Sequence, residues 1–166
     1  MKRNGWIRVI SLATALLMTA LLCACAGGKD QGADAYYIEY EGTKICPGED
    51  AEGLLDALGE PNSAKNNGNC GGQGVQMRYG YGSFDLYLLE GVDGDVTVDQ
   101  ISIKDDLIET PEGICIGSPA EDVKKAYGEP TKETAKTLVY GKGKQELIFK
   151  IEGGKVIAID LVHVTQ

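Results

Sequence analysis

The sequence predicts an α+β fold built from two tandem repeats, each a strand, a short helix and an antiparallel β-meander. A nineteen-residue stretch occurs twice, at 43–61 and 112–130, with nine identical positions at a constant offset of 69, and such an internal period fixes the architecture. Each copy has a short apolar face followed by Gly and Pro, which is typical of a helix end. Runs of alternating apolar residues follow each copy, as expected for strands. We expect the helices to pack on one face of the sheet and the other face to stay partly open.

Residues 1–24 have the pattern of a bacterial targeting segment. Three basic residues precede an apolar run, 9–22, that is too short for a comfortable membrane span. The run ends in Leu22-Cys23-Ala24-Cys25, which resembles the lipobox of bacterial lipoprotein signal peptides. The resemblance implies that Cys25 is the first mature residue and carries lipid, which anchors the protein at the extracytoplasmic face of the cell membrane. The alternative is an ordinary secretory signal that leaves Cys25 as a free thiol.

The rest of the chain divides where its composition changes. Residues 25–35 are rich in Gly, Ala and polar residues, which predicts a flexible tether. Residues 36–105 form repeat one and residues 106–166 form repeat two. The length of 36–166 suits one folded unit in which the repeats share a core.

Each repeat has its own predicted elements. In the second copy Ser118 is a candidate N-cap, Pro119 fits the first helical position and Glu121 completes a capping box. A change of phase near Asp99 predicts a β-bulge. The predicted strands are 36–40, 75–81, 84–90 and 96–103 in repeat one, and 137–140, 146–151 and 155–164 in repeat two.

The repeats differ in the connection that follows the helix. Repeat two has the short segment 131–136, whereas repeat one has the longer segment 62–74, which is rich in Asn and Gly. This composition predicts a mobile surface loop, and a loop added to one copy is a candidate functional addition. The alternative is a tolerated insertion, because lengthening a loop costs little free energy. The candidate partner-binding residues in this loop are Asn66, Asn67, Asn69 and Cys70.

Tyrosines are concentrated in repeat one, which holds six of the eight. Tyr is enriched at protein interfaces because it offers a large, rigid surface with a polar tip. Tyr87 is the best exposed candidate for binding a partner, since it opposes Leu86 and Leu88 in the alternation. The alternative is that these tyrosines are ordinary half-buried sheet residues.

The acidic charge limits the classes of partner. The net charge is −9, and removal of 1–24 leaves 13 basic and 25 acidic residues, or −12. This argues against nucleic acid, whose binding depends on Lys and Arg, and against a polybasic membrane patch. Repeat one carries −9 and repeat two carries −2, so we expect repeat one to face a basic protein partner. The alternative is a solvated acidic surface that serves solubility.

Three cysteines besides Cys25 belong to the folded part: Cys46, Cys70 and Cys115. Outside the cytoplasm a pair can form a disulfide, and an odd number leaves a free thiol. One possibility is a Cys46–Cys70 disulfide that ties the long connection to the start of its own repeat. The others are a Cys46–Cys115 disulfide between the repeats, or three reduced thiols.

The sequence shows no catalytic apparatus, so we expect a protein that is not an enzyme and takes no cofactor or metal. Its one histidine, His163, fits a half-exposed strand position. A nucleophilic pair of Cys70 and His163 would lack an orienting third group. The cysteines lack the close spacing of a zinc site, and the turn at 93–95 lacks the bidentate Glu of a calcium loop.

Two resemblances bear on fold and function. Four stretches are similar to motifs of uncharacterised lipoproteins of Gram-positive, gut-type bacteria: Asn69-Cys70, Tyr79-Gly80-Tyr81 with Phe84, 105–117, and Tyr127-Gly128. The resemblance as a whole covers most of the folded part. The tandem helix-and-meander units resemble, in architecture alone, the β-lactamase inhibitor protein and the SmpA/OmlA outer-membrane-assembly lipoproteins. This second resemblance implies a module that grips another protein with its open sheet face or its loops.

Together these observations favour a lipid-anchored extracytoplasmic protein that acts as a non-enzymatic protein-binding or scaffold module at the cell envelope. One alternative is a lipoprotein that binds a small molecule or a cell-wall fragment, which requires a deep apolar pocket. Another is an enzyme that uses Cys70 as its nucleophile.

Overall fold

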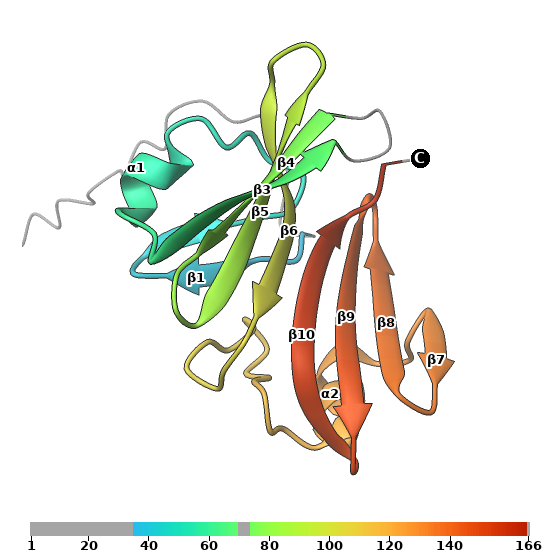
Figure 1. The fold of residues 1–166 in the computed structure, drawn as a ribbon. Coiled ribbons are helices and arrows are strands. Elements are labelled where there is room, and N and C mark those ends of the chain that lie inside the picture. The colour runs from blue at the N-terminus through green and yellow to red at the C-terminus, as the bar shows by residue number, and fades with distance from the viewer. Residues whose placement is uncertain (1–34, 70–73, 166) are drawn as a thin grey trace, which may run out of the picture.

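The computed structural model describes residues 35–69 and 74–165 (Figure 1). The helices of this part are α1 Leu54–Leu58 and α2 Ala120–Tyr127. Its strands are β1 Ile38–Tyr40, β2 Thr43–Ile45, β3 Ser63–Asn69, β4 Gly74–Gly80, β5 Phe84–Gly91, β6 Val96–Ile103, β7 Lys132–Thr134, β8 Thr137–Lys142, β9 Gln145–Glu152 and β10 Lys155–His163.

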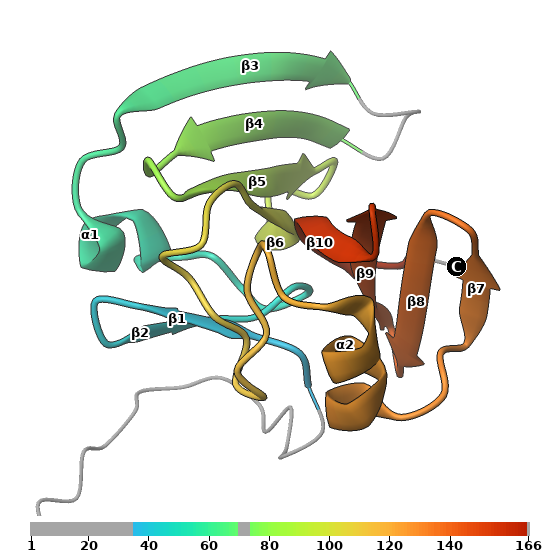
Figure 2. The same ribbon diagram turned by 90° about the horizontal axis from the view of Figure 1, so that it is seen from below.

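Eight of these strands form one antiparallel sheet in the order β3-β4-β5-β6-β10-β9-β8-β7. The two halves of the chain meet in its middle, where β6 pairs with β10. The β1–β2 hairpin, both helices and the segment between β6 and α2 all lie on one side of this curved sheet (Figure 2). In the described part of the chain no element covers the other side, so the sheet has one covered face and one open face.

The predicted α+β class, with helices packed as a layer on the sheet, is wrong. The described residues are mostly β, with about 50% in strands and 10% in helices. α1 has five residues and α2 has eight. Helices this short have little stability of their own. The cover therefore comes largely from the β1–β2 hairpin and from chain without regular structure (Figure 2).

The hydrophobic core lies between the covered face and these segments. Phe84 and Leu86 of β5 are fully buried, as are Ile38 and Ile45 of the β1–β2 hairpin. α2 adds Val123, which is also fully buried. Burying a side chain of this size is worth about 1.5–3 kcal/mol, so the hairpin and α2 are held to the sheet mainly by these contacts.

The bulge predicted near Asp99 is confirmed. Tyr87 of β5 pairs with Gln100 of β6, whereas the next residue, Leu88, pairs with Val98, so that Asp99 is the extra residue. A bulge shifts the alternation by one position. It therefore allows β6 to bury side chains on both sides of the shift.

In the connection 62–74, the part that the structure describes is not the loop that its composition predicts. Residues 63–69 form β3, which pairs with β4 along its length. Nearly all of β3 is exposed, so no apolar pattern marks it as a strand. Backbone pairing with β4 overrides the low strand propensity of Asn and Gly, and a bulge between Asn66 and Gly68 accommodates the glycine. The shorter connection in repeat two likewise contains β7.

The capping box predicted for α2 does not form. The N-cap of α2 is Pro119, and no side chain caps the helix. Ser118 Oγ instead accepts a hydrogen bond from Cys115 N at 3.1 Å. The serine hydroxyl therefore stabilises the turn before the helix and not the helix itself.

The two copies of the repeated stretch make the same contacts with the sheet. These hydrogen bonds are Gly48 N to Val98 O (2.7 Å) and Gly117 N to Val156 O (2.8 Å), and Tyr81 Oη to Gly59 O and Tyr140 Oη to Gly128 O (both 3.2 Å). Within the repeated stretch, residues 69 positions apart thus hold matching places, whereas the matching tyrosines Tyr81 and Tyr140 are 59 positions apart. The two copies can therefore be compared position by position.

Candidate functional site

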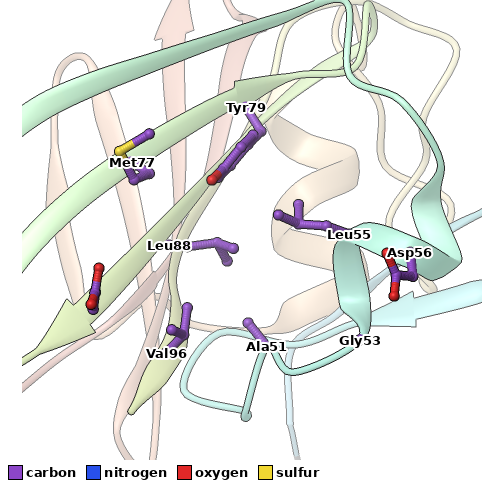
Figure 3. Close-up of a pocket in the computed structure, with 9 residues that line it drawn as sticks. Ala51, Gly53, Leu55, Asp56, Met77, Tyr79, Leu88 and Val96 are labelled. Atoms are coloured by element: carbon purple, nitrogen blue, oxygen red, sulfur yellow. The ribbon is translucent and has the colours of Figure 1, made fainter. Parts of the chain in front are cut away.

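An apolar hollow of about 260 Å³ opens on the covered side of the sheet, between α1 and strands β4, β5 and β6 (Figure 3). Leu55 of α1 points towards Tyr79 of β4 and Leu88 of β5 (Figure 3). The apolar residues that line the hollow are Ala51, Leu55, Met77, Tyr79, Leu88 and Val96. Its charged residues, Asp56 and Glu90, are both exposed.

The hollow exists because the cover ends early in this half of the molecule. α1 stops at Leu58 after five residues. The inward-facing side chains of Met77 and Tyr79 are only half-buried, whereas Leu88 is 3% exposed. Partly exposed apolar side chains gathered in a concave place are typical of binding sites.

The second copy has charged side chains where the first copy has this apolar surface. Lys124 matches Leu55, because it stands 69 positions later in the repeated stretch. Lys136 matches Met77, because each stands four positions before its matching tyrosine, Tyr140 or Tyr81. Lys124 Nζ lies 2.6 Å from Glu133 Oε1, and this hydrogen bond raises the pKa of Lys124. The open apolar surface is therefore a property of the first copy.

Only acidic charges line the hollow. Neither the carboxylate of Asp56 nor that of Glu90 has a hydrogen bond or an ion pair within the part of the chain that the structure describes. Two basic side chains of this half, those of Arg78 and Lys104, are engaged elsewhere, because they lie 3.5 and 2.9 Å from the carboxylate of Asp85. The hollow thus combines an apolar floor with two unpaired carboxylates.

Tyr87, the tyrosine predicted to face a partner, lies on the open face of the sheet. It pairs with Arg78 on one side and with Gln100 on the other, and it is half-buried. Its neighbours Leu86 and Leu88 point to the core on the covered face. Tyr87 and the hollow are therefore on opposite sides of the sheet and cannot form one site.

The three predicted asparagines lie on β3 and do not gather at one place. Asn66 pairs with Met77, which places it on the same face as the hollow, although it does not line it. Asn67 Nδ2 donates to Gln76 Oε1 at 2.9 Å, and Asn69 ends the strand. Cys70 and the predicted lipidation residue Cys25 lie outside the described residues.

Sequence reasoning missed the residues that line the hollow. The apolar face of the first copy and the predicted strand 75–81 make Leu55, Met77 and Tyr79 look like ordinary core positions. The signal that would have found them is the contrast between the copies, with Leu55 against Lys124 and Met77 against Lys136. An apolar residue at a position where the matching residue is charged indicates a difference in surroundings.

The two cysteines that the structure describes are not bonded to each other. Cys46 and Cys115 are both free thiols, so the Cys46–Cys115 disulfide does not form. Cys46 is 1% exposed, and burial raises the pKa of its thiol to about 12. The proposed Cys46–Cys70 disulfide involves a residue outside the described part of the chain.

The half-exposed strand position of His163 is confirmed, and burial lowers the pKa of its ring.

A second, more polar hollow of about 180 Å³ lies where the chain enters the fold, bordered by Tyr36, Glu112 and Lys142 among others. Tyr127 Oη donates to the Glu112 carboxylate, and burial raises the pKa of Tyr127. Tyr36 N donates to Gln145 Oε1 at 2.7 Å. Because the polar groups here already bind one another, this place fixes the chain entry and offers little to a ligand.

Among residues 35–69 and 74–165, no group of three or more His, Cys, Asp and Glu is placed to hold a metal ion. In the same part of the chain no helix is both long and apolar enough to span a bilayer. Comparison with protein-family models, with curated proteins and with solved structures finds nothing that matches this chain.

Proposed function

We propose that this protein is a lipid-anchored, extracytoplasmic and non-enzymatic module that binds another protein through the hollow of its first copy. The observation that carries the proposal is the open apolar hollow with two unpaired carboxylates, present where the matching place in the second copy carries charged side chains. An exposed apolar concavity costs solubility, so its presence in one copy favours a binding role.

The size of the hollow favours a protein over a small molecule. Pockets that enclose a whole drug-sized ligand measure about 300–1,000 Å³, and this hollow measures about 260 Å³. A cavity of about 150 Å³ holds benzene. The hollow therefore suits one bulky side chain, or two small ones, presented by a partner. The alternative of a small molecule or a cell-wall fragment is favoured less, because most of such a ligand would stay in solvent.

The anchor is the second part of the proposal. The lipobox at 22–25 supports a lipid on Cys25, and the polar segment 25–35 supports a tether between the membrane and the fold. A Cys25→Ser variant is expected to leave the membrane fraction and to lose metabolic labelling by a fatty acid. If the variant stays membrane-bound and labelled, the anchor is not on Cys25.

The binding site is tested in the native membrane with the full-length chain. A photo-reactive amino acid replaces Met77 in the hollow, and in a matched control it replaces Tyr87 on the open face. We expect one dominant cross-linked protein from position 77, identified by mass spectrometry, and its loss when Leu55→Lys is added. The proposal is contradicted if position 87 gives the same product, or if Leu55→Lys leaves the product unchanged. If neither position gives a cross-linked protein, the result favours a small ligand over a protein partner.

A further inference from the structure

We infer that the segment of the partner protein that enters the hollow carries a bulky apolar side chain flanked by Lys or Arg. This inference rests on the proposed function and names the chemistry of its partner. It excludes a neutral or acidic peptide and a second copy of this chain. Both parts of it, the apolar centre and the basic flanks, follow from the residues that line the hollow.

The apolar centre follows from the floor of the hollow. Leu55, Met77 and Tyr79 come from α1 and β4 and leave apolar surface open between them. A buried apolar group in a concave place, surrounded by contacts that exclude water, is the usual anchor of a protein interface. The flexible thioether of Met77 adapts to side chains of different shape, so an aromatic or a large aliphatic residue fits the hollow.

The basic flanks follow from the charge around it. Asp56 of α1 and Glu90 of β5 both line the hollow. Neither carboxylate has a hydrogen bond or an ion pair within the described residues. Arg78 and Lys104 do not line the hollow, and both bind Asp85. A partner with a positive charge on each side of its apolar anchor residue would form ion pairs with these carboxylates. The same charges would steer the partner towards the hollow.

The second copy of the repeat shows the same complementarity within the chain. There the position that matches Leu55 holds Lys124, and a carboxylate, Glu133, neutralises it at 2.6 Å. A cation over this part of the sheet is thus compatible with the fold when an acid lies beside it. In the first copy two other carboxylates, those of Asp56 and Glu90, line the hollow, and no cation is among the lining residues.

The large exposed apolar side chains among residues 35–69 and 74–165 do not fit the description. Val92 is 80% exposed and Leu107 is 79% exposed, but Val92 is flanked by Glu90 and Asp93, and Leu107 follows two aspartates. Inserting either into the hollow of a second copy would bring like charges together, which costs affinity. Ile157, two positions after Lys155, is only 49% exposed and lies in the paired strand β10. The occupant is therefore a different protein.

The test uses the full-length chain in detergent and three short fluorescent peptides. Their centres are Lys-Phe-Lys, Glu-Phe-Glu and Lys-Ala-Lys, and binding is measured by fluorescence anisotropy. We expect saturable binding of Lys-Phe-Lys alone, lost in Leu55→Lys. The double variant Asp56→Asn with Glu90→Gln is expected to weaken binding about two- to thirtyfold, as two exposed ion pairs would. Salt raised from about 0.15 M to about 1 M should remove the same advantage, because the Debye length falls from about 8 Å to about 3 Å.

The matched control is Asp105→Asn with Glu60→Gln, which removes the same two charges from the same half but away from the lining of the hollow. It is expected to change binding much less than the first double variant. Equal effects of the two double variants, equal binding of Glu-Phe-Glu, or no saturable binding of Lys-Phe-Lys would each overturn the inference. In all three cases the cross-link from position 77 and its loss in Leu55→Lys still decide the proposed function separately. Concentration-dependent dimers that disappear in Leu55→Lys would also overturn it, by identifying a second copy as the occupant.

Discussion

Asp160→Ala should destabilise the whole molecule, because Asp160 joins the two halves of the sheet. It lies on β10 opposite Ser102 of β6 and is 8% exposed. Its Oδ1 accepts hydrogen bonds from Ser102 Oγ at 2.6 Å and from Gln100 Nε2 at 3.3 Å, and its Oδ2 lies 3.0 Å from Lys150 Nζ. The first two contacts cross from one half of the chain to the other.

The size of the effect follows from these contacts. A hydrogen bond to a charged group contributes about 1.5–3 kcal/mol to stability, and the short bond from Ser102 counts in full. The bond from Gln100 is longer, and the same amide also donates to Ser102 Oγ at 2.8 Å, so it counts for less. Lys150 is half exposed and its ion pair contributes under about 1 kcal/mol. We expect a loss of about 2–4 kcal/mol, a large part of the 5–15 kcal/mol typical of a domain.

The assay is equilibrium unfolding in urea, followed by far-ultraviolet circular dichroism. The single tryptophan, Trp6, lies in the predicted targeting segment and outside the described residues, so circular dichroism is used in place of indole fluorescence. Lys150→Ala is the matched control and should cost under about 1 kcal/mol. Ser102→Ala should cost little once Asp160→Ala is present, because the two residues share one hydrogen bond. The reasoning is refuted if Asp160→Ala costs no more than Lys150→Ala, or if the wild type unfolds in two separate steps.

Three further predictions concern titration, reactivity and packing. Burial raises the pKa of Tyr81, Tyr127 and Tyr140, so their contribution to stability is complete below about pH 10 and is lost as the pH rises above it; Tyr127→Phe should lessen that loss, measured by unfolding across the alkaline range. The Cys46 thiol, with a pKa of about 12, should resist a thiol reagent at neutral pH until urea unfolds the chain. Gly74→Ala would place its Cβ 2.0 Å from Glu90 O, and it should therefore lower the urea midpoint, unlike an alanine at the uncrowded Gly141.

Alternation along the chain was a sound guide to the central strands. The runs that predicted β5, β6, β9 and β10 have one face in the core, so burial leaves a period of two in the sequence. β3 leaves no such trace, since it is an exposed edge strand held by backbone hydrogen bonds to β4. The fold class was mistaken for a related reason. The apolar residues of the first copy belong to a turn, a five-residue helix and its flanks, and a helical period in so short a segment does not establish a layer.

The candidate site was harder to predict, because a hollow depends on where the cover stops and not on any local pattern. Alternation places Tyr87 outward correctly, but outward in this sheet means the open face, away from the hollow. Met77 and Tyr79 have the pattern of core residues and would be core residues under a longer helix. Their half-exposure comes from the length of α1, which is set by Gly53 at its start and Gly59 at its end.

The comparison of the two copies gives the strongest argument for function at the first. Both copies keep the glycines and tyrosines that hold the motif to the sheet, and their hydrogen bonds match within 0.1 Å at the pairs Gly48–Val98 and Gly117–Val156. Stability therefore explains what the copies share. It does not explain why the second copy has the ion pair of Lys124 with Glu133 while Leu55 and Met77 of the first copy are only half-buried, since a stability requirement alone would favour the same solution in both. A partner that covers the apolar side chains of the first copy explains the difference, and Leu55→Lys, which imports the residue of the second copy, should remove that partner without unfolding the sheet.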